Sequence, residues 1–102
     1  MKKLIWTESA VDDLQGIFDF ISKDSEYYAR IFIGKIMETT EKLIEFPEIG
    51  RMVPEYDIKD IRELIFQNYR IIYKLEEKRI LILTVIHGKR DLVTINENSH
   101  QE

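Results

Sequence analysis

The chain has 102 residues, no cysteine and a formal net charge of −4. This length fits one domain over residues 1–102, and a hydrophobic content of 44% excludes a disordered chain. The lack of cysteine excludes disulfide scaffolds, thiol nucleophiles and iron–sulfur clusters, and with only two histidines we expect no metal site and no cofactor. No apolar run is long enough to cross a membrane, so we expect a cytoplasmic protein.

The first half of the sequence predicts a short strand followed by two helices. Residues 3–6 are aliphatic and aromatic, as in a strand, and Thr7 is a good helix N-cap. Apolar residues then recur at helical spacing, at Val11, Leu14, Phe18 and Ile21. A second helix is predicted over residues 26–45, and the short break before it predicts an antiparallel hairpin.

The second half predicts a loop and then a β-meander. Proline ends the second helix because Pro47 disfavours helical backbone in the residue before it, so residues 47–60 are expected to form a loop. Strands are predicted at residues 61–66, 69–75 and 79–86. A two-residue turn at Gln67-Asn68 would pair Arg62 with Tyr73. A weak further strand near residues 92–95 and a flexible tail over residues 95–102 are also predicted.

The predicted order of elements is β-α-α-β-β-β, which is typical of an α+β fold. We expect the helical hairpin to pack on a small, antiparallel-rich sheet. The sequence leaves the place of the first strand in this sheet open.

Charge is distributed unevenly along the chain. Residues 1–50 carry six Lys and Arg against ten Asp and Glu, whereas residues 62–90 carry seven against three. The basic segment predicts either a local anion-binding face or an ordinary solvated strand surface.

Four side chains of the basic segment form a candidate site. Arg62 and Arg70 are expected to share the sheet face opposite to the core residues, with His87 and Arg90 following the third strand of the meander. Arginines bind phosphates through a planar fork, and a histidine can transfer a proton at neutral pH. This set would suffice for a metal-free ribonuclease.

Two structural explanations of the same residues stay open. The arginines would instead pair with acidic neighbours, at Glu55, Glu63 or Glu76. His87 precedes Gly88 at the end of a strand, where it would simply hydrogen-bond a backbone carbonyl of the turn.

The order of motifs along the chain resembles one known family. The motifs are Trp6-Thr7-x-x-Ala10-x-x-Asp13-Leu14-x-x-Ile17, Ala29, Leu43-x-x-Phe46-Pro47-x-x-Gly50, Arg62-Glu63-Leu64, Asn68-Tyr69-Arg70-Ile71-Ile72-Tyr73 and Ile82-Leu83-x-Val85-x-His87-Gly88-x-Arg90. Together they resemble the RelE/ParE superfamily of toxins from type II toxin–antitoxin systems. The resemblance implies a small toxin of a plasmid-stabilisation type of module, encoded beside an antitoxin that binds and neutralises it.

Two activities occur in this superfamily. The helical hairpin and the Phe46-Pro47-x-x-Gly50 exit resemble the ParE-like branch, which implies inhibition of DNA gyrase without catalysis. The alternative is a RelE-like endoribonuclease that cuts ribosome-bound mRNA with His87, Arg62, Arg70 and Arg90 as catalytic residues. A third hypothesis is that the protein is a degenerate relative of these toxins without toxicity. In each case we expect the protein to form a complex with its antitoxin, whose acidic residues would cover the face of Arg62, Arg70 and Arg90.

Overall fold

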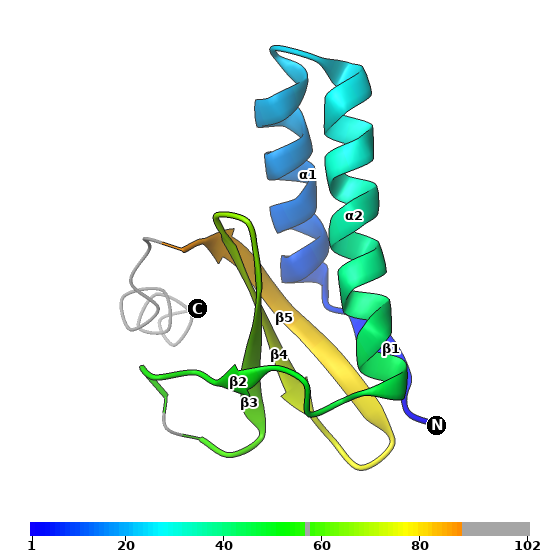
Figure 1. Ribbon diagram of the computed structural model, residues 1–102, viewed down its shortest axis with the longest axis vertical. Helices are drawn as coiled ribbons and strands as arrows, with labels where there is room; N and C mark the ends of the chain where they lie inside the picture. Colours follow the sequence, from blue (N-terminus) through cyan, green and yellow to red (C-terminus); the bar gives the residue numbers. More distant parts are fainter. Residues whose placement is uncertain (57, 89–102) are drawn as a thin grey trace.

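The computed structural model describes residues 1–56 and 58–88 of the chain. The elements in these residues, labelled in Figure 1, are β1 Lys3–Trp6, α1 Glu8–Ser22, α2 Glu26–Glu45, β2 Arg51–Met52, β3 Ile61–Phe66, β4 Tyr69–Leu75 and β5 Arg79–His87. The strand predicted at 3–6 and the helix predicted at 26–45 are confirmed residue for residue. The predictions for residues 92–95 and 95–102 lie outside the described residues.

The strands form one sheet in the order β1-β5-β4-β3-β2. Neighbouring strands are antiparallel except β1 and β5, which are parallel, so the expected α+β fold with an antiparallel-rich sheet is confirmed. The structure adds two features to the expectation. The predicted loop at residues 47–60 contains the short edge strand β2, and β1 forms the opposite edge, where Lys3–Trp6 pair with residues 79–82.

The two helices form the expected antiparallel hairpin. Each begins at a hydroxyl cap, because Thr7 Oγ1 accepts a hydrogen bond from the Ala10 N–H and Ser25 Oγ accepts one from the Tyr28 N–H. Figure 1 shows α1 and α2 lying side by side along the sheet and extending well beyond its end. In the part of the chain that the structure describes, neither helix is long and apolar enough to cross a membrane.

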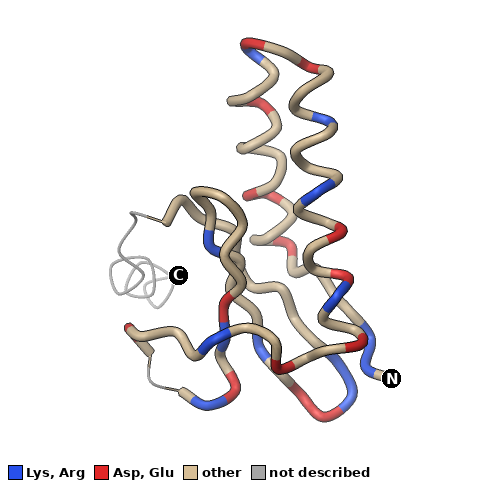
Figure 2. Tube along the Cα trace, in the orientation of Figure 1, with Lys and Arg blue, Asp and Glu red and all other residues tan. Residues whose placement is uncertain are grey.

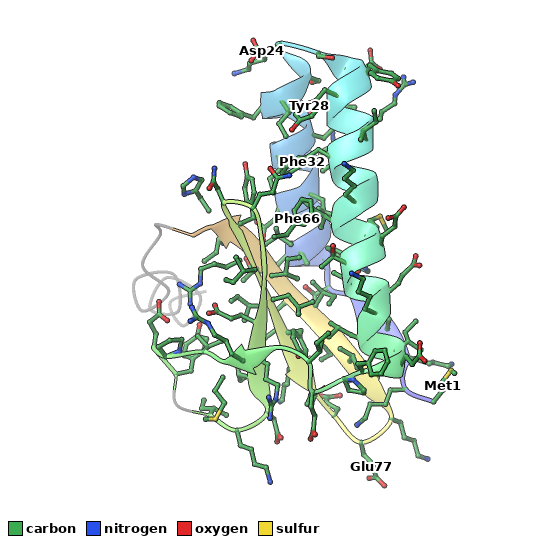
Figure 3. All side chains as sticks on the ribbon, in the orientation of Figure 1. Met1, Asp24, Tyr28, Phe32, Phe66 and Glu77 are labelled. Atoms are coloured by element: carbon green, nitrogen blue, oxygen red, sulfur yellow. The ribbon has the colours of Figure 1, made fainter. Side chains whose placement is uncertain are left out.

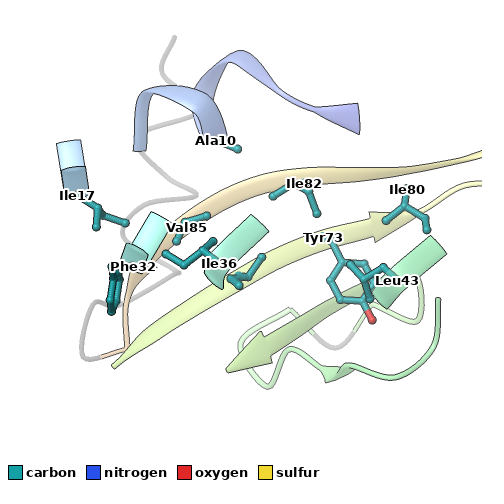
Figure 4. Packing of buried hydrophobic residues seen from close by; sticks show 10 residues of the cluster. Ala10, Ile17, Phe32, Ile36, Leu43, Tyr73, Ile80, Ile82 and Val85 are labelled. Atoms are coloured by element: carbon teal, nitrogen blue, oxygen red, sulfur yellow. The ribbon is translucent and has the colours of Figure 1, made fainter. Parts of the chain in front are cut away.

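The main hydrophobic core lies between the hairpin and one face of the sheet (Figure 4). Phe32, Ile36 and Leu43 of α2 pack there against Tyr73 and Ile82 of the sheet. A second, smaller cluster covers the opposite face, formed by Val53, Ile61, Ile72 and Ile86 with Tyr56 against it. We call the first face the helix face and the second, covered by the segment after β2, the loop face.

A row of aromatic rings connects the hairpin to the end of the sheet. The Phe32 ring centre lies 6.1 Å from that of Tyr28, 5.4 Å from that of Phe66 and 5.7 Å from that of Tyr69. Figure 3 shows Tyr28, Phe32 and Phe66 in succession from the hairpin tip toward the sheet. Because edge-on ring contacts are favourable beyond the area that they bury, this row holds the β3–β4 turn against α2.

Residues around α1 fasten an irregularity in β5. The pairing of β4 with β5 shifts near Leu83, which has no counterpart in the register. Thr7 Oγ1 donates a hydrogen bond of 2.7 Å to the carbonyl oxygen just before this residue. The Asp13 carboxylate accepts hydrogen bonds from the Thr84 hydroxyl, at 2.5 Å, and from the Val85 N–H, at 2.9 Å. The Thr7 and Asp13 of the first sequence motif therefore dock α1 on β5.

The segment that leaves α2 is fixed by one tyrosine. The Tyr73 hydroxyl accepts a hydrogen bond from the Gly50 N–H and donates one to the Pro47 carbonyl oxygen, both at 2.9 Å. A Cβ atom at residue 50 would lie 2.5 Å from the Tyr73 hydroxyl oxygen and 2.6 Å from the Glu63 carbonyl oxygen. The Phe46-Pro47-x-x-Gly50 motif is thus a structural device that brings the chain from α2 to the sheet edge.

Candidate functional site

An open cleft of about 580 Å³ lies where the β3–β4 turn meets the end of β5. It is lined by two arginines, a glutamate, a histidine and mostly polar turn residues: Arg51, Pro54, Glu55, Ile65, Gln67, Asn68, Tyr69, Arg70, His87 and Gly88. The predicted two-residue turn is confirmed, and Gln67 takes the positive φ, 51°, that such tight turns require. The Gly88 N–H donates a hydrogen bond of 2.7 Å to the Asn68 carbonyl oxygen and so closes one wall.

Arg70 on the loop face is the centre of a network of charges in this cleft. Its Nε donates to Glu63 Oε1 at 2.6 Å, while Nη1 and Nη2 donate to Glu55 Oε2 and Oε1 at 2.8 and 2.9 Å. The other oxygen of Glu63 accepts a hydrogen bond of 2.6 Å from Arg51 Nε. The guanidinium of Arg70 is therefore held from two directions, and one of these contacts is a bidentate fork.

Two members of this network are buried in the protein. The Glu63 side chain is fully buried and that of Arg70 is 9% exposed, whereas Arg51 is 64% exposed. The hydrogen bonds that Arg70 donates to Glu55 raise the pKa of Arg70 above its ordinary value and lower the pKa of Glu55 below its own. Both groups are thus held in their charged forms. Of the open explanations, pairing of Arg70 with Glu55 and Glu63 is confirmed.

Arg62 lies on the other side of the sheet. It stands opposite Tyr73 in the register, on the helix face, whereas Arg70 stands opposite Ile65 on the loop face. The prediction that Arg62 and Arg70 share a face is therefore wrong. With a two-residue turn, even-numbered residues of β3 stand opposite odd-numbered residues of β4, so Arg62 and Arg70 point to opposite sides.

The contacts of Arg62 are to backbone. Its Nη1 donates to the carbonyl oxygens of Gly50, at 2.8 Å, and Glu48, at 3.4 Å. Its Nε is buried and has no hydrogen-bond partner among the described residues. Arg62 thus holds the exit from α2, and the expected pairing with a glutamate is not seen in residues 1–56 and 58–88.

Of the other two predicted site residues, His87 is part of the described structure and Arg90 is not. His87 is exposed at the rim of the cleft, and its ring centre lies 5.7 Å from that of Tyr69 in an edge-on contact. Arg90 lies outside the described residues. The structure therefore brings Arg70 and His87 to one cleft and places Arg62 elsewhere.

Sequence reasoning named Glu63 as a possible partner of the arginines, but it missed the burial of Glu63 and its contact with Arg51. A signal for its burial was present, since Glu63 lies two residues from both Ile61 and Ile65 and so shares a strand face with these apolar side chains. A carboxylate there needs a partner, because an unpaired buried charge is strongly unfavourable. Arg51 gave no such signal, since its place depends on the path of the loop after α2.

The charges of the network around Arg70 balance. Two arginines face two glutamates, and Figure 2 shows acidic and basic positions close together where β2, β3 and β4 meet. Within residues 1–56 and 58–88, no group of three or more His, Asp and Glu side chains could hold a metal ion. A cation that already binds two carboxylates has little capacity left for a phosphate, so the cleft as it stands is suited to polar contact more than to phosphate chemistry.

Known proteins resemble this chain over nearly its whole length. The family model described as ParE toxin of type II toxin–antitoxin system, parDE, matches residues 4–92. A relative named Toxin RelE2, from Caulobacter vibrioides, is 29% identical over 91 residues, which are 88% of this chain and 99% of the relative.

Two solved structures have the same fold. The chromosomal ParDE toxin–antitoxin system from P. aeruginosa contains a chain with a TM-score of 0.74 and 23% identity, and the match covers 87% of this chain and 98% of that one. The toxin–antitoxin complex RelBE2 from Mycobacterium tuberculosis gives a TM-score of 0.60 at 17% identity, with 84% and 90% covered. At these identities the structures establish the shared fold of helical hairpin and sheet.

Proposed function

Because the chain belongs to the ParE toxin family of type II toxin–antitoxin systems, we propose that it arrests growth by binding and inhibiting DNA gyrase, without a catalytic step of its own. It is a toxin of the RelE/ParE superfamily, in which the ParE-like branch acts on gyrase and the RelE-like branch cleaves mRNA. Gyrase works on the chromosome, so this proposal places the toxin in the cytoplasm.

The pairing of the Arg70 guanidinium with two glutamates is the observation on which we choose between the two activities. A metal-free ribonuclease needs cations aimed at the phosphate on which charge develops. Arg70 instead directs Nε, Nη1 and Nη2 at two carboxylates, and Arg62 is bound to backbone carbonyls on the helix face. Of the three arginines predicted to bind the transition state, the two that the structure describes, Arg62 and Arg70, are engaged within the protein, which supports a toxin that acts by binding.

Measuring macromolecular synthesis in cells after induction tests the target. We expect incorporation of labelled thymidine to stop first, while mRNA remains intact and uridine and methionine incorporation continue for a time. Phased cuts in ribosome-bound mRNA with continuing DNA synthesis would overturn the gyrase proposal. Normal growth on induction of the folded chain would overturn it as well and favour a relative without toxicity.

Replacing His87 with alanine separates the mechanisms with purified proteins. A nuclease that uses this imidazole for proton transfer would lose roughly 10²–10⁴ in rate. We expect H87A to inhibit gyrase supercoiling as well as the unchanged chain does, because no proton transfer is involved. His87 is exposed, so the variant should fold, which circular dichroism verifies.

We propose that a cognate antitoxin covers the helical hairpin. Large apolar side chains are exposed along α1 and α2, with Phe20 at 67% and Tyr27 at 77%, as suits contact with an amphipathic helix of a partner. The similar P. aeruginosa and M. tuberculosis structures are described as a toxin–antitoxin system and a toxin–antitoxin complex.

The expectation that one acidic antitoxin segment covers Arg62 and Arg70 together does not fit the structure, because the two arginines lie on opposite faces of the sheet. Co-expression with the product of the neighbouring gene should restore growth.

A further inference from the structure

We propose that one end of the molecule is a self-complementary surface through which two copies of this chain associate about a two-fold axis. The surface lies where the exit from α2, the start of β1 and the β4–β5 turn meet, and we call it the exit surface. Figure 3 labels Met1 and Glu77 at this end and Asp24, of the hairpin tip, at the other. The inference goes beyond the proposed function and does not depend on whether gyrase is the target.

Two large apolar side chains stand out from one half of the exit surface, which we call the apolar half. Phe46 and Ile49 are each 55% exposed and border an open groove of about 700 Å³. Pro47 and Leu75 line the same groove, and so does the exposed Glu48. Exposed apolar side chains that gather in one place mark interaction sites, whereas scattered ones are ordinary surface.

The other half of the exit surface is a hollow of about 660 Å³, which we call the basic half. Ile44 lines it together with three bases and one acid from β1, the β4–β5 turn and the start of β5: Lys3, Lys78, Arg79 and Glu77. Lysine and arginine side chains have an apolar stem below a charged end. The basic half can therefore hold an apolar side chain beside positive charges.

A two-fold axis along the border between the halves makes them complementary. Lys2, Glu45 and Pro47 line both hollows and so mark this border. In a two-fold dimer both subunits use the same patch, and each half lies over the opposite half of the second copy. Phe46 of each copy then enters the basic half of the other, where cations meet its ring, and Glu48 meets the lysines there.

The charges of both halves are available for pairing between copies. Within residues 1–56 and 58–88, Glu48, Lys3 and Lys78 form no ion pair. Arg79 is already paired, because its Nε donates a hydrogen bond to Glu76. Each contact between Glu48 and a lysine of the second copy would occur twice in the dimer, so it would fix the relative orientation of the copies.

Internal contacts hold both halves in place before they associate. The Tyr73 hydroxyl binds the backbone of Pro47 and Gly50 in the apolar half. Beside the basic half, Lys2 Nζ donates hydrogen bonds to two carbonyl oxygens of the β4–β5 turn. A surface that is already ordered loses little conformational freedom on association.

The position of the exit surface leaves the other sites of the molecule open. Strand β5 begins at this surface with Arg79 and ends at the cleft with His87. The hairpin tip lies at the far end of the molecule (Figure 3). The dimer would therefore carry two hairpins and two clefts on its outside. Such a bivalent protein binds a partner with two equivalent sites more tightly than a monomer does.

Sedimentation velocity of the purified full chain at increasing concentrations tests the proposal. We expect a monomer at low concentration and a dimer at high concentration, with a dissociation constant on the order of 10 µM, as suits a small interface. F46A should raise this constant at least about tenfold, because it removes the side chain that enters the basic half. Circular dichroism verifies that each variant is folded.

Ile49→Ala and Ile58→Ala form a matched pair for the apolar half. The two isoleucines are exposed to a similar degree, at 55% and 51%, but Ile58 does not line the exit surface. We expect I49A to weaken the dimer and I58A to leave its dissociation constant unchanged. Equal effects of the two variants would overturn the proposal.

Charge reversal tests the two-fold arrangement itself. E48K and K78E should each weaken the dimer at least about tenfold, because each places like charges opposite one another at two positions. E48Q only removes the charge and should weaken the dimer less. The double variant E48K/K78E restores opposite charges and should return to within about threefold of the unchanged chain.

Four outcomes would refute association through this surface. A chain that stays monomeric at all concentrations would do so, as would assemblies that grow beyond a dimer, because a two-fold contact closes. Failure of the double variant to recover would rule out reciprocal pairing of Glu48 and Lys78. A monomer whose thermal midpoint rises with a short acidic peptide would assign the exit surface to a different protein.

Discussion

Gly50 occupies a position where no larger residue fits. An added Cβ would approach the Tyr73 hydroxyl oxygen at 2.5 Å and the Glu63 carbonyl oxygen at 2.6 Å, and the second of these belongs to the backbone of β3. The contact cannot be relieved by turning a side chain alone. The segment from α2 to β2 would have to move, with loss of the hydrogen bond from the Gly50 N–H to Tyr73.

Gly50→Ala and Gly34→Ala should therefore change stability in opposite directions. We expect G50A to lower the free energy of unfolding by about 2 kcal/mol or more, as overpacking of a closed site does. At Gly34 in α2 a Cβ would meet nothing within 4 Å, so G34A should raise it by about 0.5–1 kcal/mol through helix propensity. Urea unfolding of the two variants measures both, and equal effects would contradict this account.

Glu55 should make the stability of the protein depend on pH in acid. The hydrogen bond from Arg70 holds the pKa of Glu55 below its ordinary value of 4.5, so between the two values the unfolded chain binds more protons than the folded chain. The stabilisation by Glu55 is thus fully present above about pH 4.5 and is lost as the pH falls through the lower folded-state pKa. We expect urea unfolding of E55Q to show a weaker decline in acid than the unchanged chain or E48Q.

The ion-pair partners of the arginines were easier to predict than the sheet face to which each arginine points. The sequence correctly suggests acidic partners for Arg70, because Glu55 and Glu63 are near in the chain and pairing is the usual fate of a buried arginine. It places Arg62 on the wrong face because the turn reverses the alternation between the two strands. The bidentate contact between Arg70 and Glu55 depends on how the segment after β2 folds over the loop face, and no local sequence pattern specifies this path.

At the scale of elements, α1 is held to β5 by polar contacts at the irregular position. The Asp13 carboxylate accepts from the Thr84 hydroxyl and the Val85 N–H, and the side chain of Val85 is buried in the main core. The strand loses regular pairing there, so side chains of the helix supply hydrogen bonds that the sheet does not.

Asp13→Ala should break this attachment, whereas Asp12→Ala should leave it intact. We expect D13A to cost about 2 kcal/mol of stability, because it leaves a partly buried N–H and a hydroxyl without their charged acceptor. Asp12 is the adjacent, exposed residue of the same helix, and D12A should change stability by no more than about 0.5 kcal/mol. Chemical denaturation gives both values. A loss in D12A as large as that in D13A would mean that the helix charge, and not the contact to β5, is responsible.

Element types and bounds were accessible from the sequence because their signals are local. Hydroxyl caps, helical spacing and the proline after α2 define residues 26–45, and the two-residue turn defines the β3–β4 register. The strand β2 has only two residues and carries no pattern of its own. The place of β1 depends on pairing with a strand more than seventy residues later in the chain, which periodicity does not report.

For the molecule as a whole, β1 joins the beginning of the chain to β5 near its end. The Lys3 N–H donates to the Lys78 carbonyl oxygen at 3.0 Å, and the Thr7 N–H donates to that of Ile82 at 3.1 Å. Leu4 and Trp6 pack against the main core between these bonds. The strand thus covers the edge of β5 and anchors the start of α1, and we expect the sheet and the hairpin to unfold as one unit.

Deleting residues 1–6 should therefore abolish cooperative unfolding and with it toxicity. The truncated chain loses the parallel partner of β5 and two core side chains, while α1 loses the strand that leads into its cap. We expect a broad, shallow thermal transition by circular dichroism. An extension placed before Met1, which is fully exposed, serves as the control and should leave the sharp transition of the unchanged chain. A truncated chain that melts cooperatively at the unchanged temperature would show that β4, β5 and the hairpin form a stable core without β1.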